Sequence, residues 1–177
     1  MTLPMDILVA EHKLILQAVE LARKEADKTH LNAAVNPNFV ATIVDFFRTY
    51  ADRFHHGKEE GILFNGLFQK KLDEANQKMM NELVLEHALA RQTVTALENA
   101  KDRYVSGETD ALGDVLKAID TIVKLYPAHV EKEDAHFFYP VMTYFSVQEQ
   151  EEMLANFLNF NRNFTDKKYR QIINSFG

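Results

Sequence analysis

The sequence of 177 residues contains no cysteine, and it has few of the residues that form turns. Without cysteine the chain cannot form a disulfide framework, an iron–sulfur cluster or a cysteine-based zinc site, and it cannot use a thiolate in catalysis. The 6 glycines and 4 prolines are about half the share usual in a globular chain. This scarcity argues against an all-β sandwich and favours long helices.

A basic surface and long apolar runs are also missing. The 20 Lys and Arg residues against 26 Asp and Glu residues give a net charge of −6, so we expect no nucleic-acid partner. The longest uncharged stretches, Leu31–Val44 and His136–Gln148, are too short and too polar to span a bilayer. Acidic residues at positions 6 and 11 are unlike the start of a secretory signal. We therefore expect a cytoplasmic protein with no membrane partner.

Hydrophobic residues recur at spacings of three and four in four long segments, which is the pattern of amphipathic helices. No segment alternates with a period of two. The sequence therefore predicts an all-α protein, with an up-down-up-down four-helix bundle over residues 1–145. A C-terminal helical extension over residues 146–177 is expected to pack on the bundle. Apolar residues make up 46% of the chain, which is ample for one core.

Local signals predict where the helices begin and end. Asn36-Pro37 is typical of a helix start, and Ser146–Glu149 reads as a capping box. The polar stretch Asp73–Gln77 predicts a turn, and Ser106-Gly107 predicts the end of the third helix. Pro127 predicts a kink within the fourth helix. The last stretch, Thr165–Phe176, is expected to form a further helix.

An internal repeat relates the two halves of the chain. Leu8–His12 reappears as Leu83–His87, seventy-five residues later, and His55–Glu60 is echoed by His129–Asp134, seventy-four residues later. The chain thus reads as two related helical hairpins around an approximate two-fold axis. Such an axis through a bundle core is a natural place for a symmetric two-metal site.

Each of the four predicted helices places one histidine on its core-facing stripe, and two of these histidines have a glutamate one turn later. The resulting set is His12, His55, Glu59, His87, His129 and Glu133. Side chains at positions i and i+4 superpose on a helix and can reach one centre. Burying this set without a cation raises the pKa of the carboxylates by roughly three units or more, whereas two cations satisfy both residue types. A purely structural polar core is the alternative.

Nitrogen and oxygen ligands without sulfur favour iron or manganese, with zinc as a possible substitute. His56 lies about 100° round the helix from His55 and is a weaker ligand candidate. We expect Glu60 to lie beside the ligands or in solvent, and His136 to pack below the site or to bond a backbone group. Of the remaining groups, His30 is expected in solvent. Tyr126 is either a hydrogen-bond donor to a metal-bound oxygen or an ordinary core residue.

The motifs together resemble the hemerythrin-like, HHE cation-binding family. They are Glu11-His12, His55–Phe64, Glu86-His87 and His129–Asp134, the last followed by Phe138 and Pro140, and they spread over residues 8–140. The resemblance implies a non-haem diiron centre with an oxo or hydroxo bridge. It also implies that the six stripe residues are the ligands. Activities across the family include reversible oxygen binding, sensing of oxygen, nitric oxide or iron, and iron handling.

Two departures argue against reversible oxygen carriage. Oxygen-carrying members have a second histidine one turn along the third helix, where this chain has Arg91, and their fourth helix supplies aspartate where this chain has Glu133. Counting these ligands on two six-coordinate ions leaves one open position on each ion, or one in total if His56 also binds. We expect a protein that binds, senses or reduces a small diatomic molecule or peroxide, with an external electron donor. The alternative is an iron-responsive module in which Ser146–Gly177 responds to the metal.

Overall fold

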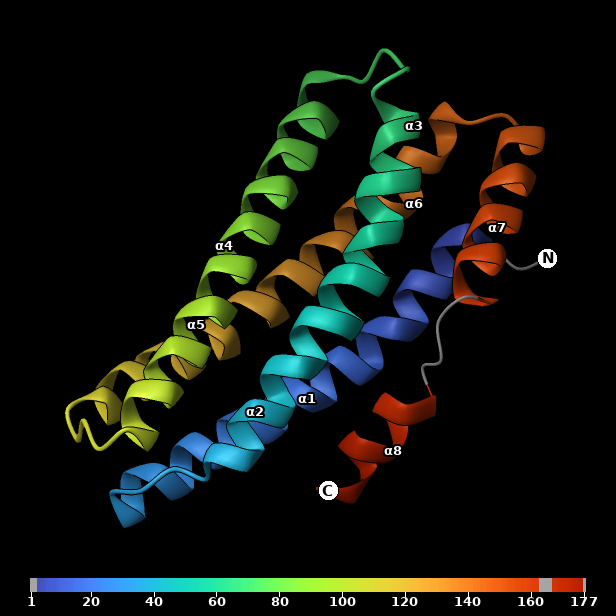
Figure 1. Cartoon of the computed structure of the whole chain (residues 1–177). Coiled ribbons are helices and arrows are strands. Elements are labelled where there is room, and N and C mark those ends of the chain that lie inside the picture. The colour runs from blue at the N-terminus through green and yellow to red at the C-terminus, as the bar shows by residue number, and fades with distance from the viewer. Residues whose placement is uncertain (1–2, 163–166, 177) are drawn as a thin grey trace.

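Helices make up nearly the whole of the chain in a computed structural model that describes residues 3–162 and 167–176. No strand occurs within these two ranges, as the sequence predicted. None of their helices combines the length and the apolar character that a membrane span requires. Figure 1 shows long helical rods packed side by side into a bundle, with two shorter helices near the C-terminus.

Two of the rods are single long helices and two are composite. The single helices are α1 (Pro4–Asn32) and α4 (Glu74–Val105). The second rod consists of α2 (Pro37–Phe46), η1 (Phe47–His56), η2 (Glu59–Phe64) and α3 (Asn65–Leu67). The fourth consists of α5 (Ala111–Lys132), η3 (Glu133–Phe137), α6 (Phe138–Val141) and the 3₁₀ turn η4 (Met142–Tyr144). The C-terminal helices are α7 (Val147–Arg162) and α8 (Lys167–Ser175).

The segments η1, η2 and η3 are π-helical, and they carry four of the residues that the sequence predicted as metal ligands, namely His55, His56, Glu59 and Glu133. Wide turns of this kind inside α-helices occur frequently at functional sites. They also change which residues face inward, because each turn holds more residues than an α-turn. His136, predicted to pack below the site, is therefore 59% exposed, whereas Phe137 is fully buried. The prediction for His136 was wrong for this reason.

The predicted helix starts and stops are largely confirmed. The Asn36 side chain accepts hydrogen bonds from two backbone N–H groups in the first turn of α2. Ser146 and Glu149 form the reciprocal bonds of a capping box at the start of α7. Gly107 follows α4 with a φ of 97°, a left-handed conformation that glycine adopts without strain. Polar side-chain caps thus set the starts of α2 and α7, and a glycine follows the end of α4.

The predicted turn over Asp73–Gln77 was wrong in position. The α4 helix already begins at Glu74, because the Asp73 carboxylate caps it by accepting a hydrogen bond from the backbone N–H of Asn76. A polar stretch that caps and opens a helix has the same composition as a turn. Further along, α5 continues without a break through Pro127.

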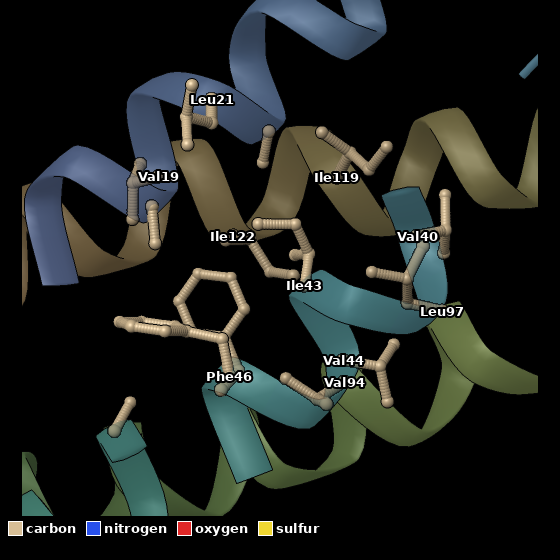
Figure 2. Packing of buried hydrophobic residues seen from close by; sticks show 14 of the residues in the cluster. Val19, Leu21, Val40, Ile43, Val44, Phe46, Val94, Leu97, Ile119 and Ile122 are labelled. Carbon is tan, nitrogen blue, oxygen red and sulfur yellow. The ribbon is translucent and has the colours of Figure 1, made fainter. Parts of the chain in front are cut away.

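Buried apolar side chains form two separate clusters. The larger one holds Val19, Ile43, Phe46, Leu97 and Ile122, which come from α1, α2, α4 and α5. Figure 2 shows these side chains converging from the four helices. The smaller cluster gathers residues from the other end of the same rods, near the start of α1 and the end of the fourth rod. The polar residues of the predicted site lie between the two clusters in the chain order of every rod.

The C-terminal helices add to both clusters. Phe157 of α7 is fully buried in the smaller cluster, and Tyr169 and Ile173 of α8 are buried in the larger one. Both helices contact α1. The further helix predicted over Thr165–Phe176 is observed as α8. The first two predicted positions, Thr165 and Asp166, lie outside the described residues.

Candidate metal centre

A belt of buried polar side chains lies between the two apolar clusters. It contains all six stripe residues, and each of them is less than 5% exposed: His12, His55, Glu59, His87, His129 and Glu133. They come from all four rods. Polar and charged groups are costly to bury unless they are paired or coordinate a metal, so the partners of these six side chains decide what the belt can do.

The ligand atoms of the belt converge in two groups of four, and within each group they lie within 4.8 Å of one another. One group consists of His12, His55, Glu59 and Glu133, and the other of His56, Glu59, His87 and His129. Glu59 belongs to both groups. The structure thus brings together all seven candidate ligands, including His56, the weaker one.

The imidazole rings face each other in two pairs. Nε2 of His55 lies 2.8 Å from Nε2 of His12, and Nε2 of His87 lies 3.2 Å from Nε2 of His129. One pair belongs to each group of four. The protonation of these nitrogens follows from what the opposite nitrogen of each ring, Nδ1, contacts.

Every one of these four rings has a carboxylate at Nδ1. The pairs are His12 with Asp134 at 2.8 Å, His55 with Glu11 at 2.9 Å, His87 with Glu60 at 2.7 Å and His129 with Glu86 at 2.8 Å. An ionised carboxylate only accepts hydrogen bonds, so Nδ1 donates. In a neutral ring Nε2 then carries a lone pair that points into the belt. Carboxylate–histidine pairs of this kind orient metal-binding imidazoles in proteins.

The two glutamates of the belt are the second reason to expect cations there. All four carboxylate oxygens of Glu59 and Glu133 are buried, and they have no hydrogen-bond partner among the described residues. Imidazole nitrogens approach them, as His55 Nε2 does Glu59 at 3.1 Å and His129 Nε2 does Glu133 at 3.2 Å, but without hydrogen-bond geometry. A metal ion between them would accept the nitrogen lone pairs and neutralise the carboxylates at the same time.

The pKa values of these two glutamates also indicate that the belt is unfavourable without a cation. Burial, together with the nearby charge of Glu59, raises the pKa of Glu133 well above its ordinary value. Burial also opposes ionisation of Glu59, but in the absence of a metal the positive charge of a protonated His55 ring, with a smaller contribution from His87, outweighs it and lowers the pKa of Glu59 to about 2. When two buried carboxylates share one site, their pKa values separate in this way, one rising and the other falling. The donor set, with nitrogen and oxygen and no sulfur, fits iron, manganese or zinc.

The carboxylates at Nδ1 are the part of the site that sequence reasoning missed. Glu60 was expected beside the ligands, and it does bond His87. The roles of Glu11, Glu86 and Asp134 were not predicted. The internal repeat held the signal, because Glu11 is equivalent to Glu86 and Glu60 to Asp134. The repeat also relates the histidines that they bond: Glu11 bonds His55 as Glu86 bonds His129, and Glu60 bonds His87 as Asp134 bonds His12.

Two lysines, also equivalent in the repeat, extend the network with different surroundings. Lys58 is fully buried and donates to Glu11 and, at 2.9 Å, to Asn161 of α7. Lys132 donates to Glu86 at 2.5 Å, and its side chain is 25% exposed. One half of the site is therefore closed by the C-terminal helix, and the other half reaches the surface.

His56 breaks the symmetry of the belt, because the repeat has Val130 at the equivalent position. The His56 ring is 1% exposed and stacks on His87 with 3.8 Å between ring centroids. Burial, with the neighbouring His87, lowers the pKa of His56 well below its ordinary value. A neutral imidazole at this place can offer a lone pair to a metal. The second group therefore contains three imidazoles and the first contains two.

The remaining residues that the sequence analysis singled out lie outside the two groups of ligand atoms. His30 is exposed, as expected. Tyr126 is 3% exposed, and burial, reinforced by the charge of Asp52, raises the pKa of its phenol. Arg91, which stands where oxygen carriers have histidine, forms ion pairs with Asp52 and Glu60, both at 2.7 Å.

Comparison with known families gives one match. The family model described as the hemerythrin HHE cation binding domain matches residues 3–141. No curated protein and no solved structure matches the chain. The matched range includes the four rods as far as α6 and all seven candidate ligands.

Proposed function

Because the chain belongs to the hemerythrin HHE cation-binding domain family, we propose that its buried belt binds two iron ions within an up-down-up-down four-helix bundle. The observation that carries this proposal is the two facing pairs of imidazole Nε2 atoms, 2.8 and 3.2 Å apart, beside four carboxylate oxygens without hydrogen-bond partners among the described residues. Manganese and zinc are possible substitutes, because the donors are nitrogen and oxygen.

The two groups of ligand atoms suggest how the residues divide between the ions. His12, His55 and Glu133 would hold one ion, and His56, His87 and His129 would hold the other. Glu59, a member of both groups, is suited to bridge the two ions. Glu133 also approaches the second group, with 3.9 Å between its Oε1 and Nε2 of His87, which supports a second bridge.

Iron bound here supplies Lewis acidity and one-electron redox chemistry. The surrounding protein residues orient the ligands for this chemistry. The carboxylates at Nδ1 fix each imidazole in the tautomer that directs Nε2 inward, and they increase its basicity. The two apolar clusters cover the belt toward both ends of the bundle. We propose that the protein uses this centre to bind, sense or reduce a small diatomic molecule, oxygen or nitric oxide, or peroxide, with electrons from an external donor.

A second candidate function is an iron-responsive regulatory or iron-handling protein without turnover. The connection from His55 through Glu11 and Lys58 to Asn161 favours it, because α7 is thereby tied to the centre. Limited proteolysis of metal-free and iron-loaded protein tests this candidate. Slower cleavage near α7 in the loaded protein supports it, and identical cleavage patterns refute it.

Reconstitution tests the main proposal. Metal-free protein is loaded with iron(II) without oxygen, then exposed to oxygen, while the absorption spectrum and the iron content are followed. We expect two irons per chain and a new near-ultraviolet band from the oxidised centre. His55→Ala removes a ligand and loses iron, whereas the matched control His136→Ala, at an exposed histidine, keeps it. Iron binding that is insensitive to His55→Ala contradicts the proposal.

A further inference from the structure

A cavity of about 270 Å³ opens to solvent between η1, α4 and α5, beside the metal centre. Phe47, Ala90 and Val94 form the apolar part of its wall, and the rest is polar or charged, including His56 and Tyr126. A single water molecule needs only roughly 10–15 Å³, and small-molecule sites begin at about 300 Å³. The cavity is therefore larger than a diatomic molecule requires, and at about 270 Å³ it is close to the lower end of this range, which suits only a small organic molecule.

Two of the lining side chains are polar and deeply buried. Tyr126 is 3% exposed, and its hydroxyl has no hydrogen-bond partner within the part of the chain that the structure describes. His56 is 1% exposed, and its ring centroid lies 6.5 Å from that of Tyr126. Ligand sites typically combine apolar walls with a few such polar groups, which orient the ligand. The Tyr126 hydroxyl is thus a donor for an oxygen atom of a bound molecule.

Three arginines and one acidic residue, Asp52, line the cavity, so positive charge is in excess there in a chain whose net charge is −6. Two of the arginines are already paired: Arg48 with Glu98 at 2.6 Å and Arg91 with Asp52 at 2.7 Å. The third, Arg53, is exposed and forms no ion pair with any residue in the described ranges. A cation with no partner beside an apolar cavity attracts an organic anion.

We propose that this cavity binds a small organic anion, with its carboxylate beside Arg53 and an oxygen at its other end accepting a hydrogen bond from Tyr126. A narrower void, which leads from His56 and Tyr126 toward His87 and His129, has no room for a water molecule. The anion therefore binds beside the metal centre and contacts it through His56. Only this contact with the metal rests on the proposed function, since the binding itself needs no metal.

Titration with 4-hydroxybenzoate, followed by calorimetry on the protein as purified, tests the proposal. Benzoate lacks the inner oxygen and 4-hydroxybenzamide lacks the charge, so both should bind more weakly than 4-hydroxybenzoate. Arg53→Gln should weaken binding about three- to fivefold, as for an exposed ion pair, and added salt should do the same. Tyr126→Phe should weaken it roughly fivefold, as for one neutral hydrogen bond.

Two further variants complete the design. Thr95→Trp fills the cavity from its exposed side and should abolish binding. Arg23→Gln, at an exposed arginine of α1 outside the cavity, should leave binding unchanged. Equal binding of all three probes, or binding that survives Thr95→Trp, overturns the proposal.

Metal content measured on the same samples separates this inference from the proposed function. Two irons per chain without probe binding refutes the cavity site alone. Probe binding in a chain that takes up no metal supports the cavity site and refutes the metal centre. A change in the absorption spectrum of the iron-loaded protein on adding 4-hydroxybenzoate, absent in Thr95→Trp, is expected if the anion contacts His56. An unchanged spectrum contradicts that contact.

Discussion

The substitutions Glu11→Gln and Glu86→Gln should have similar effects on metal binding and different effects on stability. Both carboxylates accept a hydrogen bond from a histidine of the belt and another from a lysine. Glutamine keeps the shape and one accepting oxygen but removes the charge. Since carboxylates behind metal-binding histidines contribute about 10- to 100-fold in affinity, we expect a loss of that size in both variants.

The two variants should differ in stability because Glu11 is more deeply buried than Glu86. Glu11 and Lys58 form a buried pair, with side chains 6% and 0% exposed, and removing one partner of such a pair costs about 3–5 kcal/mol. Glu86 and Lys132 are 24% and 25% exposed, and we expect about 1 kcal/mol there. For a chain of this length, 1 kcal/mol lowers Tm by about 2–4 °C. The expected losses are then about 6–20 °C for Glu11→Gln and about 2–4 °C for Glu86→Gln.

Thermal unfolding of the metal-free proteins, followed by circular dichroism, measures these losses, because bound metal would add its own stabilisation. Adding Lys58→Met to Glu11→Gln should recover part of the stability, since both charges are then gone and the buried space stays filled. Equal losses in the two single variants would refute the assignment of Lys58 and Glu11 as a buried ion pair.

Three other predictions concern the helices around the site, each measured as a change in Tm. Asn36→Ala removes the cap of α2, which accepts two backbone N–H groups, and should cost about 1 kcal/mol, or about 2–4 °C; an unchanged Tm contradicts the cap. Phe157→Ala leaves a hole in the smaller cluster and should cost about 3–5 kcal/mol; a loss below 1 kcal/mol shows that α7 does not pack there. The hydrogen bonds from Lys70 and Ser146 lower the pKa of Glu149 from 4.5 to about 2, so its contribution to stability is present above pH 4.5 and is lost as the pH falls toward 2. Glu149→Gln should therefore lower Tm at pH 7 but not at pH 2, and a difference independent of pH refutes the ion pair.

Helical periodicity and the repeat were sufficient to predict the residues that form the belt. His12 and His87 lie on their stripes at spacings that a regular α-helix preserves, and the repeat singled out His55, not His56, as the equivalent of His129. The sequence pattern put His56 beside the core-facing stripe as a weaker ligand candidate, and its ring is fully buried against His87. The π-helical turns around it are not encoded in a 3.6-residue period.

The partners of the histidines could not be predicted from local pattern, because they are distant in the chain. Glu11 bonds His55 across 44 positions, and Asp134 bonds His12 across 122. Such pairs are decided by how the rods are aligned, which the spacing within one helix does not specify. The burial of Lys58 had no sequence signal for the same reason, since Asn161 of α7 reaches it from the far end of the chain.

The metal-to-protein ratio is the most direct test of the central claim, that the belt holds two cations. Metal-free protein is titrated anaerobically with iron(II), freed of unbound metal, and analysed by atomic emission together with a Glu59→Gln variant. We predict two irons per chain in the unaltered protein and fewer in the variant, because Glu59 contributes to both groups. A ratio below two in the unaltered protein, or an unchanged ratio in Glu59→Gln, would contradict the account.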